Sequence, residues 1–501
     1  MNSNILVLVL ASPLLGALAV NLLGKISKKH VTPWTLGSLV LSAAGSYVVL
    51  AKVLLHGTFT YTVGGWNPPY GIQLVLDPLS AIMLAVVSTV ALIATGVALP
   101  SIKKEMLNRS HLFFSLYLIL VSGMMGLVIT GDAFNLYVLL EIVSITSYGL
   151  IAMGKGGRAP LASFNYIIMG TIGACFYLLG VGYLYLMTGT LNMADIASSL
   201  SGLYGSPTVA AAFCFIMIGL LIKMGFFPLH GWLPNAYSYA PVGASVLIAP
   251  LMTKITVYLM IRILFRIFTP DFIFAAHSGI RHLVVWVAAL GVIAASVIAL
   301  NQKNFVRMLT YVIIAEVGYM VGGIWLGNTE GLTGTIFHII NDAFMTVCFF
   351  SVAAALLYRV GTTRIENLHR LFEKMPLTMA VLVVGALSVV GVPPLCGFFS
   401  KWYLLLGGFE AHHYGFVIAL IFSSAANAVL FFRVLEAAFS KGEMTPAEGA
   451  HAEEGEEASV REDAPAFMIP SLVAVAVALI LIGLNAQTVV SQLVPRAILN
   501  L

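Results

Sequence analysis

The fold is decided by two similar stretches, Gly225-Phe-Phe-Pro-Leu-His-Gly-Trp232 and Gly391-Val-Pro-Pro-Leu-Cys-Gly-Phe398. Glycine, proline, leucine and glycine recur in them at identical spacing, and each stretch lies in the middle of a long apolar segment. A proline deep inside a helix removes a backbone donor and breaks the helix. The freed carbonyls must then be satisfied by protein or by a water-filled cavity. We therefore predict two broken membrane helices that serve an ion path, against the plainer alternative of two packing kinks.

The composition of the whole chain indicates a membrane protein. Of its 501 residues, 60% are hydrophobic and 9% are charged, whereas soluble domains carry roughly 25% charged residues. Apolar runs long enough for membrane helices recur along the chain, and the short alternating pattern of membrane β-barrels is absent. The fold class is therefore predicted to be all-α and polytopic. The net charge of +4 is small and dispersed, which gives no support to nucleic-acid binding.

About fourteen membrane spans are predicted. Their limits are 4–24, 33–55, 76–99, 112–130, 133–154, 163–189, 207–235, 242–268, 282–300, 305–327, 332–358, 376–407, 412–438 and 466–488. Lysine and arginine gather in the odd-numbered loops, with Arg266 and Arg281 near the eighth loop as exceptions. By the positive-inside rule, the odd loops are cytoplasmic and both termini lie on the other side of the cell membrane. The two breaks fall in spans seven and twelve, which run in opposite directions, so an inverted repeat is predicted.

Several ionisable residues lie inside the predicted spans, where each costs on the order of 3 kcal/mol unless it has a partner, water or a function. The main candidates for a proton path are Glu141, Lys223, Lys254, His338 and Lys401, with His230, Glu316 and Asp342 as secondary candidates. Buried lysine changes its protonation state readily, and histidine titrates near neutral pH. The alternative is a set of static ion pairs and side chains that reach toward the membrane surface.

Several motifs carry a resemblance to a known family. They are T-G-D-A-F-N-L-Y-V-L-L-E at 130–141, K-M-G-F-F-P-L-H-G-W-L-P-N-A-Y at 223–237, L-M-T-K-I-T-V-Y at 251–258 and G-V-P-P-L-C-G-F-F-S-K at 391–401. Over nearly its whole length, the chain resembles the antiporter-like subunits of Mrp-type sodium/proton antiporters, membrane-bound hydrogenases and respiratory complex I. The stretches at 64–77, 130–136 and 188–195 most resemble the D-type subunit of the Mrp antiporters.

The resemblance implies two inverted five-helix bundles. The expected units are 1–110 for the first three helices, 111–270 for helices 4–8, 281–438 for helices 9–13, 439–465 for a charged cytoplasmic loop and 466–501 for the last helix. The family also implies that Glu141 and Lys223 form the interacting pair of the first half-channel and that Lys254 bridges the halves. His338 would continue the central polar axis, and Lys401 would close the second half-channel. Thr346 stands about where family members often carry a lysine, and Asp342 precedes it, which leaves conduction by the second half open.

The function predicted first is that of a proton-translocating subunit of a multi-subunit Na⁺/H⁺ antiporter. The alternative is a proton-pumping membrane subunit of a redox-driven complex, of the hydrogenase or quinone oxidoreductase type. A structural scaffold is the third class, and the buried titratable residues argue against it. The sequence has no cysteine cluster and no dinucleotide fingerprint, so no cofactor or metal is expected in this chain. The expected partners are other membrane subunits, the lipid bilayer and protons, with Na⁺ as a further candidate.

Overall fold

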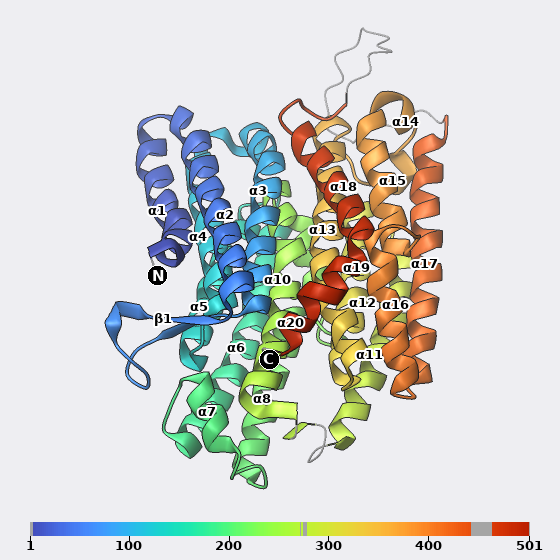
Figure 1. The fold of residues 1–501 in the computed structure, drawn as a ribbon. Helices are drawn as coiled ribbons and strands as arrows, with labels where there is room; N and C mark the ends of the chain where they lie inside the picture. Colours follow the sequence, from blue (N-terminus) through green and yellow to red (C-terminus); the bar gives the residue numbers. More distant parts are fainter. Residues whose placement is uncertain (1–3, 271, 274–277, 442–462, 500–501) are drawn as a thin grey trace.

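The computed structural model describes residues 4–270, 272–273, 278–441 and 463–499, and this part of the chain is nearly all helical (Figure 1). The long helices are α1 (Asn4–Ile26), α2 (Val31–His56), α3 (Pro78–Met106), α4 (Ser110–Ile129), α5 (Ala133–Ala152), α6 (Arg158–Thr188), α8 (Pro207–Met224), α10 (Val242–Ile263), α11 (Ser278–Leu300), α12 (Phe305–Trp325), α13 (Thr329–Arg359), α15 (Pro376–Val390), α16 (Cys396–Glu410), α17 (Tyr414–Phe439) and α18 (Ile469–Leu484). Shorter helices are α7 (Met193–Leu200), α9 (Leu233–Tyr239), α14 (Leu371–Lys374), α19 (Ala486–Thr488) and α20 (Val494–Leu499). Most of the predicted charged loop, residues 442–462, lies outside the described residues.

By length and composition, the described residues contain 11 helices able to cross a membrane, or up to 12 if the bent pair Ile469–Leu484 and Ala486–Leu499 is one span. The upper figure of 12 differs from the predicted fourteen for two reasons. The segment Pro78–Ile129, which holds α3 and α4, counts as one apolar stretch. The twelfth predicted span is divided into α15 and α16, each only 15 residues long. The multi-pass helical fold is confirmed, whereas the number fourteen stays a prediction.

Both predicted helix breaks are present in the structure. The first lies between α8, which ends at Met224, and α9, and the second lies between α15, which ends at Val390, and α16. A glycine in the left-handed conformation follows each helix, with φ of 70° at Gly225 and 91° at Gly391. Side chains with a Cβ atom rarely adopt such φ values, which explains why the repeated motif starts with glycine.

The two breaks are also closed by the same backbone hydrogen bonds. The Phe226 N–H donates to the Leu221 carbonyl at 3.0 Å, and the Val392 N–H donates to the Leu387 carbonyl at 3.0 Å. This bond across the helix end is the signature of a Schellman cap, which satisfies carbonyls that the ended helix leaves free. The shared cap supports the predicted repeat.

A second backbone pattern, an antiparallel bridge at the cap of a helix, also occurs twice in the described part of the chain. An antiparallel bridge joins Asp132 to Asn192, and an equivalent bridge joins Asn304 to Arg364, 172 residues further along. Asp132 caps the start of α5 through the Asn135 N–H, as Asn304 caps α12. Burial raises the pKa of the Asp132 carboxyl. The starts of α5 and α12 are therefore fixed in the same way. The five-helix units and their limits stay a prediction.

Two segments between the predicted spans contain short elements. The strands β1 (Phe59–Thr62) and β2 (Gln73–Leu76) form an antiparallel hairpin, so the all-α prediction needs this small correction. The hairpin is held because the Gly131 N–H donates to the Gln73 carbonyl, 2.8 Å away. In the other loop, α7 buries one apolar face, formed by Met193, Ile196 and Leu200.

The core of the molecule is formed by α10 and α13, which lie in the middle of the bundle in Figure 1. Every residue of α10 from Gly243 to Ile263 is buried, and so is every residue of α13 from Gly331 to Leu356. By contrast, α6 exposes much of its apolar surface, as expected of a lipid-facing helix. Charged residues on α10 and α13 therefore lie as far from lipid as this fold allows.

Candidate functional site: a line of buried lysines and carboxylates

The first pair joins α5 to the end of α8. The Lys223 Nζ lies 3.2 Å from Oε1 of Glu141 and donates to the Ser144 hydroxyl at 2.7 Å. Glu141 and Ser144 are three residues apart on α5 and therefore share one face of that helix. Lys223 is buried, while 26% of the Glu141 side chain is exposed. The ammonium is thus held between a carboxylate that reaches the surface and a neutral hydroxyl.

The central pair joins α10 to α13. The Lys254 Nζ lies 2.9 Å from Oδ2 of Asp342, and neither residue is exposed to solvent. Thr346 closes this cluster because its hydroxyl donates to Oδ1 of Asp342 at 2.8 Å and accepts from Lys254 at 3.1 Å. At position 346 this chain therefore places a hydroxyl that binds both members of a buried ion pair.

Glu316 on α12 extends this cluster toward the second half. Its buried carboxyl interacts electrostatically with Asp342, Lys254 and Lys401. In the described part of the chain, its Oε1 has no hydrogen-bond partner. Buried polar atoms of this kind are usually bonded to water. Glu316, a secondary candidate by sequence, thus lies between the central pair and the last lysine.

Lys401 lies directly against the second helix break. Its Nζ donates to the carbonyl of Val389 at 2.6 Å and to the hydroxyl of Ser424 at 3.0 Å. The carbonyl end of a helix carries partial negative charge, so it favours a cation there. At the first break a neutral group binds a carbonyl at the helix end, because the Trp232 indole donates to the carbonyl of Ile222 at 3.2 Å.

His338 occupies the centre of the second half. Its Nδ1 lies 3.0 Å from the Ser400 hydroxyl, and its ring lies 5.4 Å from that of Tyr319. Its Nε2 has no hydrogen-bond partner among the described residues. Tyr319 continues the polar chain by donating to Ser423 at 2.5 Å. His338 therefore has one ring nitrogen held by Ser400 and one ring nitrogen that is buried without a partner among the described residues.

His230 lies apart from the other predicted residues. It sits within the first break, with its ring 5.4 Å from that of Phe227 and 6.3 Å from that of Tyr311. Its contacts in the described structure join it to aromatic rings and to none of the other candidates. Glu141 and Lys223, by contrast, form a pair, and so do Lys254 and Asp342.

A narrow apolar space separates the first pair from α10. Its lining includes Lys223 and Ser144 on one side and Met252, Ile255 and Thr256 of α10 on the other, and its volume is about 10 Å³. A cavity needs roughly 10–15 Å³ to hold one water molecule. The line of polar groups is therefore interrupted here by a space for one water at most.

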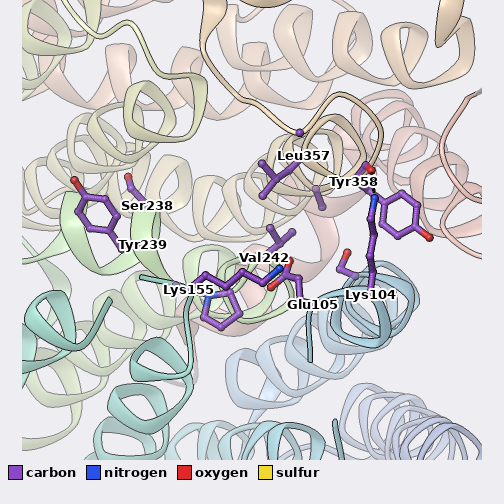
Figure 2. Close-up of a pocket in the computed structure, with 13 residues that line it drawn as sticks. Lys104, Glu105, Lys155, Ser238, Tyr239, Val242, Leu357 and Tyr358 are labelled. Carbon is purple, nitrogen blue, oxygen red and sulfur yellow. Dashed lines mark hydrogen bonds between the residues drawn. The ribbon is translucent and has the colours of Figure 1, made fainter. Parts of the chain in front are cut away.

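A larger cavity opens on the face predicted to be cytoplasmic (Figure 2). It has a volume of about 390 Å³, and Glu105 and Lys155 meet across it. Its walls include Val242, the first residue of α10, and Leu357 near the end of α13. From Val242, α10 leads over twelve residues, about 18 Å, to Lys254. The cavity thus lies at the predicted cytoplasmic ends of α10 and α13, the two helices that carry the central pair.

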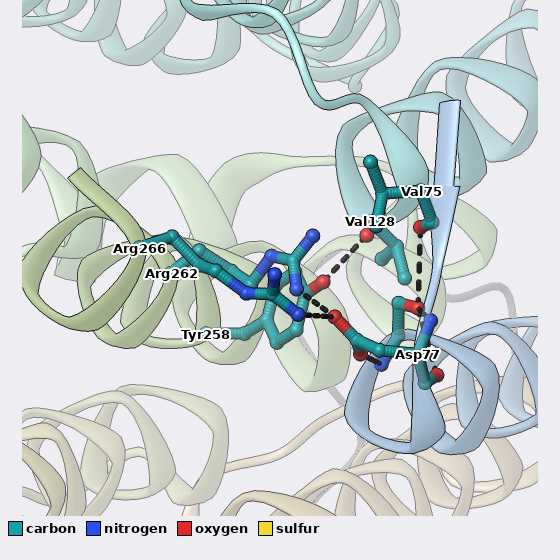
Figure 3. Close-up of polar contacts among 7 residues, drawn as sticks. Val75, Asp77, Val128, Tyr258, Arg262 and Arg266 are labelled. Atoms are coloured by element: carbon teal, nitrogen blue, oxygen red, sulfur yellow. Dashed lines mark hydrogen bonds and ion pairs between the residues drawn. The ribbon is translucent and has the colours of Figure 1, made fainter. Parts of the chain in front are cut away.

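The sequence did not reveal a buried charge cluster at the opposite end of α10 (Figure 3). Asp77, the N-cap of α3, accepts hydrogen bonds from Arg262 and, at 3.1 Å, from Arg266. Tyr258 lies beside them and donates to the Val128 carbonyl at 2.5 Å. Arg262 and Arg266 are four residues apart on one helical face, a spacing that could have indicated a shared anionic partner. This cluster ties the helix of Lys254 to the start of α3.

These features define a class of protein. A helical bundle that keeps paired lysines and carboxylates in its lipid-free centre is typical of ion-translocating membrane proteins. No group of three or more His, Cys, Asp or Glu side chains suited to a metal ion occurs among the residues that the structure describes.

Comparison with known proteins identifies the family. Residues 130–426 match the family described as NADH:quinone oxidoreductase/Mrp antiporter, TM, and the chain belongs to this family. It is 40% identical over 502 residues to the N-type subunit of NADH-quinone oxidoreductase from Desulforudis audaxviator (strain MP104C), covering 99% of both chains. It is 31% identical over 443 residues to the D-type subunit of the Na(+)/H(+) antiporter from Bacillus subtilis (strain 168), covering 87% of both.

The fold is shared with a solved respiratory complex. A chain in the structure of the membrane-bound sulfane sulfur reductase, an archaeal respiratory membrane complex, is 30% identical and matches with a TM-score of 0.87. The match covers 98% of this chain and 96% of that one. The family predicted from the motifs is confirmed. The more specific likeness to the D-type Mrp subunit is not favoured over the redox alternative, because the relative from NADH-quinone oxidoreductase is more similar.

Proposed function

We propose that this chain is a proton-translocating membrane subunit of a multi-subunit complex. The observation that carries the proposal is the Lys254–Asp342 pair, which is completely buried where the central helices α10 and α13 meet. Charges in such a position are expensive and usually functional. The family membership and the flanking residues Glu141, Lys223 and Lys401 support the same function.

The contacts suggest how a proton is held and released. While Glu141 lies beside Lys223, the charged ammonium is stabilised. If the carboxylate moves away, an isolated ammonium in a dry interior is less stable than the neutral amine, so the proton leaves. The small space beside Met252 must admit water before that proton can pass toward Lys254. On the other side, Glu316 and Lys401 repeat the combination of carboxylate and lysine.

We further propose that the complex is redox-driven and that its redox centres lie in partner membrane subunits. This choice rests on the relative from NADH-quinone oxidoreductase, which is 40% identical over 99% of this chain. A cation/proton antiporter is the second candidate, supported by the relative from the Na(+)/H(+) antiporter. The predicted orientation would place both termini on the non-cytoplasmic side of the cell membrane.

Two measurements test this proposal. The native complex, purified through a tag on this chain, is expected to contain iron–sulfur centres and to acidify proteoliposomes when an electron donor and a quinone are supplied. Acidification driven by a Na⁺ gradient, without iron in the preparation, would establish the antiporter instead. The test of translocation itself is the double variant Lys254→Met/Asp342→Asn, which removes both central charges together. Proton movement at the wild-type rate in this variant would refute the proposed path.

A further inference from the structure

A second cavity on the predicted cytoplasmic face is strongly basic. Its volume is about 610 Å³, within the range of roughly 300–1,000 Å³ that is common for small-molecule sites. Four basic side chains line it, those of Arg158, Lys303, Arg307 and Arg364, together with one acidic side chain, that of Glu366. Ser238 and Tyr239 line both this cavity and the one in Figure 2. An excess of cations around one hollow favours an anionic ligand.

The backbone brings these cations together from both halves of the chain. Arg158 is the first residue of α6, and Arg307 lies in the first turn of α12. The bridge between Asn304 and Arg364 places the third arginine beside the start of α12. The same pairing continues where the Ile365 N–H donates to the Lys303 carbonyl at 2.9 Å. The arrangement is therefore fixed by main-chain hydrogen bonds that do not depend on the basic side chains themselves.

The positive charge of this cavity is poorly compensated. Arg364 lies 3.7 Å from Glu366, and both side chains are more than half exposed. Arg158 donates to the Tyr239 hydroxyl, a neutral group, at 3.3 Å. Within the ranges that the structure describes, the side chains of Lys303 and Arg307 form no ion pair. Two cations are thus available to an anion in the hollow, and Arg158, bonded only to a neutral hydroxyl, adds a third.

An apolar surface begins directly at this cavity. After Arg158 along the chain, α6 presents Leu161, Phe164 and Ile168 on one face, with exposed fractions of 58%, 56% and 46%. A free phosphate would need the cations alone, whereas a lipid needs a basic site next to an apolar, membrane-facing surface. We propose that the cavity binds the phosphate headgroup of an anionic phospholipid, with the acyl chains lying along α6. Basic pockets between helices at the cytoplasmic surface are suited to such headgroups, and arginine binds phosphate oxygens through paired hydrogen bonds.

The experiment is a lipid titration of the purified full-length chain, followed by native mass spectrometry. The wild-type chain is expected to bind phosphatidylglycerol at least tenfold more tightly than phosphatidylcholine. Each cation near an anionic headgroup contributes about fivefold in affinity. The double variant Lys303→Gln/Arg307→Gln is therefore expected to weaken phosphatidylglycerol binding more than tenfold. The conservative pair Lys303→Arg/Arg307→Lys is expected to retain it.

A matched control removes the same charge elsewhere on the same predicted face. Lys103 and Arg109 are exposed and lie outside the cavity, so Lys103→Gln/Arg109→Gln is expected to change the affinity less than twofold. Equal losses in both double variants, or no loss in either, would overturn the proposal. Complete displacement of phosphatidylglycerol by millimolar inorganic phosphate would assign the cavity to a soluble anion instead. If the Lys303/Arg307 variant does not fold, Arg158→Gln alone must lower the affinity about fivefold or the site is refuted.

Discussion

The central pair allows a structural role and a functional role to be separated by two variants. Lys254→Met alone leaves the Asp342 carboxylate buried without its cation, at a position with no solvent exposure. Removing one member of a buried pair costs about 3–5 kcal/mol. The Thr346 hydroxyl still donates to Asp342 and compensates only in part. We therefore expect this single variant to unfold at markedly lower denaturant concentration than the wild type.

The double variant Lys254→Met/Asp342→Asn removes the unpaired charge. Asparagine keeps an acceptor for the Thr346 hydroxyl, and methionine fills the volume of the lysine stem. Replacing both members of a buried pair is often nearly neutral for stability, so most of the lost stability is expected to return. Proton translocation is not expected to return, because neither replacement can carry a proton.

Both properties can be measured on the same preparations. Unfolding in mixed micelles gives the free energy, and quenching of a pH-sensitive dye in proteoliposomes gives the initial rate of proton movement. Lys29, exposed on the predicted cytoplasmic surface, provides a charge-loss control through Lys29→Met. A double variant that recovers both stability and translocation would show that the buried pair is only structural. A double variant as unstable as the single one would contradict the assigned ion pair.

Three other predictions follow from single contacts. Met252→Ala is expected to widen the narrow space beside Lys223 and to raise passive proton leakage in vesicles. The control is Met320→Ala, at a buried site in α12, which is expected to lower stability without adding leakage. Arg262→Met is expected to cost less than the roughly 3–5 kcal/mol of a fully unpaired buried charge, because Arg266 still pairs with Asp77. Arg262→Met/Asp77→Asn should recover most of that loss, and equal stability of the two variants would refute the buried pair. Burial raises the pKa of the Asp132 carboxyl. The contribution of Asp132 to stability is therefore present below the ordinary aspartate pKa and is lost as the pH rises through the raised pKa. Asp132→Asn is expected to reduce this pH-dependent loss in unfolding titrations, and an unchanged profile would contradict the raised pKa.

The sequence predicted the features that depend on local chemistry. Glycine and proline in the repeated motif indicated both breaks because they act on their own backbone. The partners of Glu316 and Asp77 could not be predicted in this way. Glu316 interacts electrostatically with Lys401 only because α12, α13 and α16 pack together, and Asp77 meets Arg262 across 185 residues of chain. Which face of a uniformly apolar helix turns inward depends on packing between helices, and a single sequence carries little information about that packing.

The two predicted halves have matching helix caps and strand bridges but differ in where their charged residues lie. At the offset of 172 residues seen in the strand bridges, Glu316 of α12 takes the position that Ser144 holds in α5. The carboxylate has therefore moved one helical turn relative to Glu141, while the lysine has moved from before the break, at Lys223, to after it.

Each predicted half still holds one lysine and one carboxylate, and the Lys254–Asp342 pair lies between them. A proton added to this series changes its net charge by one unit. At an effective dielectric constant of 20, a unit charge acts on another 10 Å away with about 1.7 kcal/mol. A neighbouring pair at that separation would shift more than tenfold in protonation. Electrostatic coupling of this kind needs no continuous chain of water, and the space between Lys223 and α10 holds at most one water.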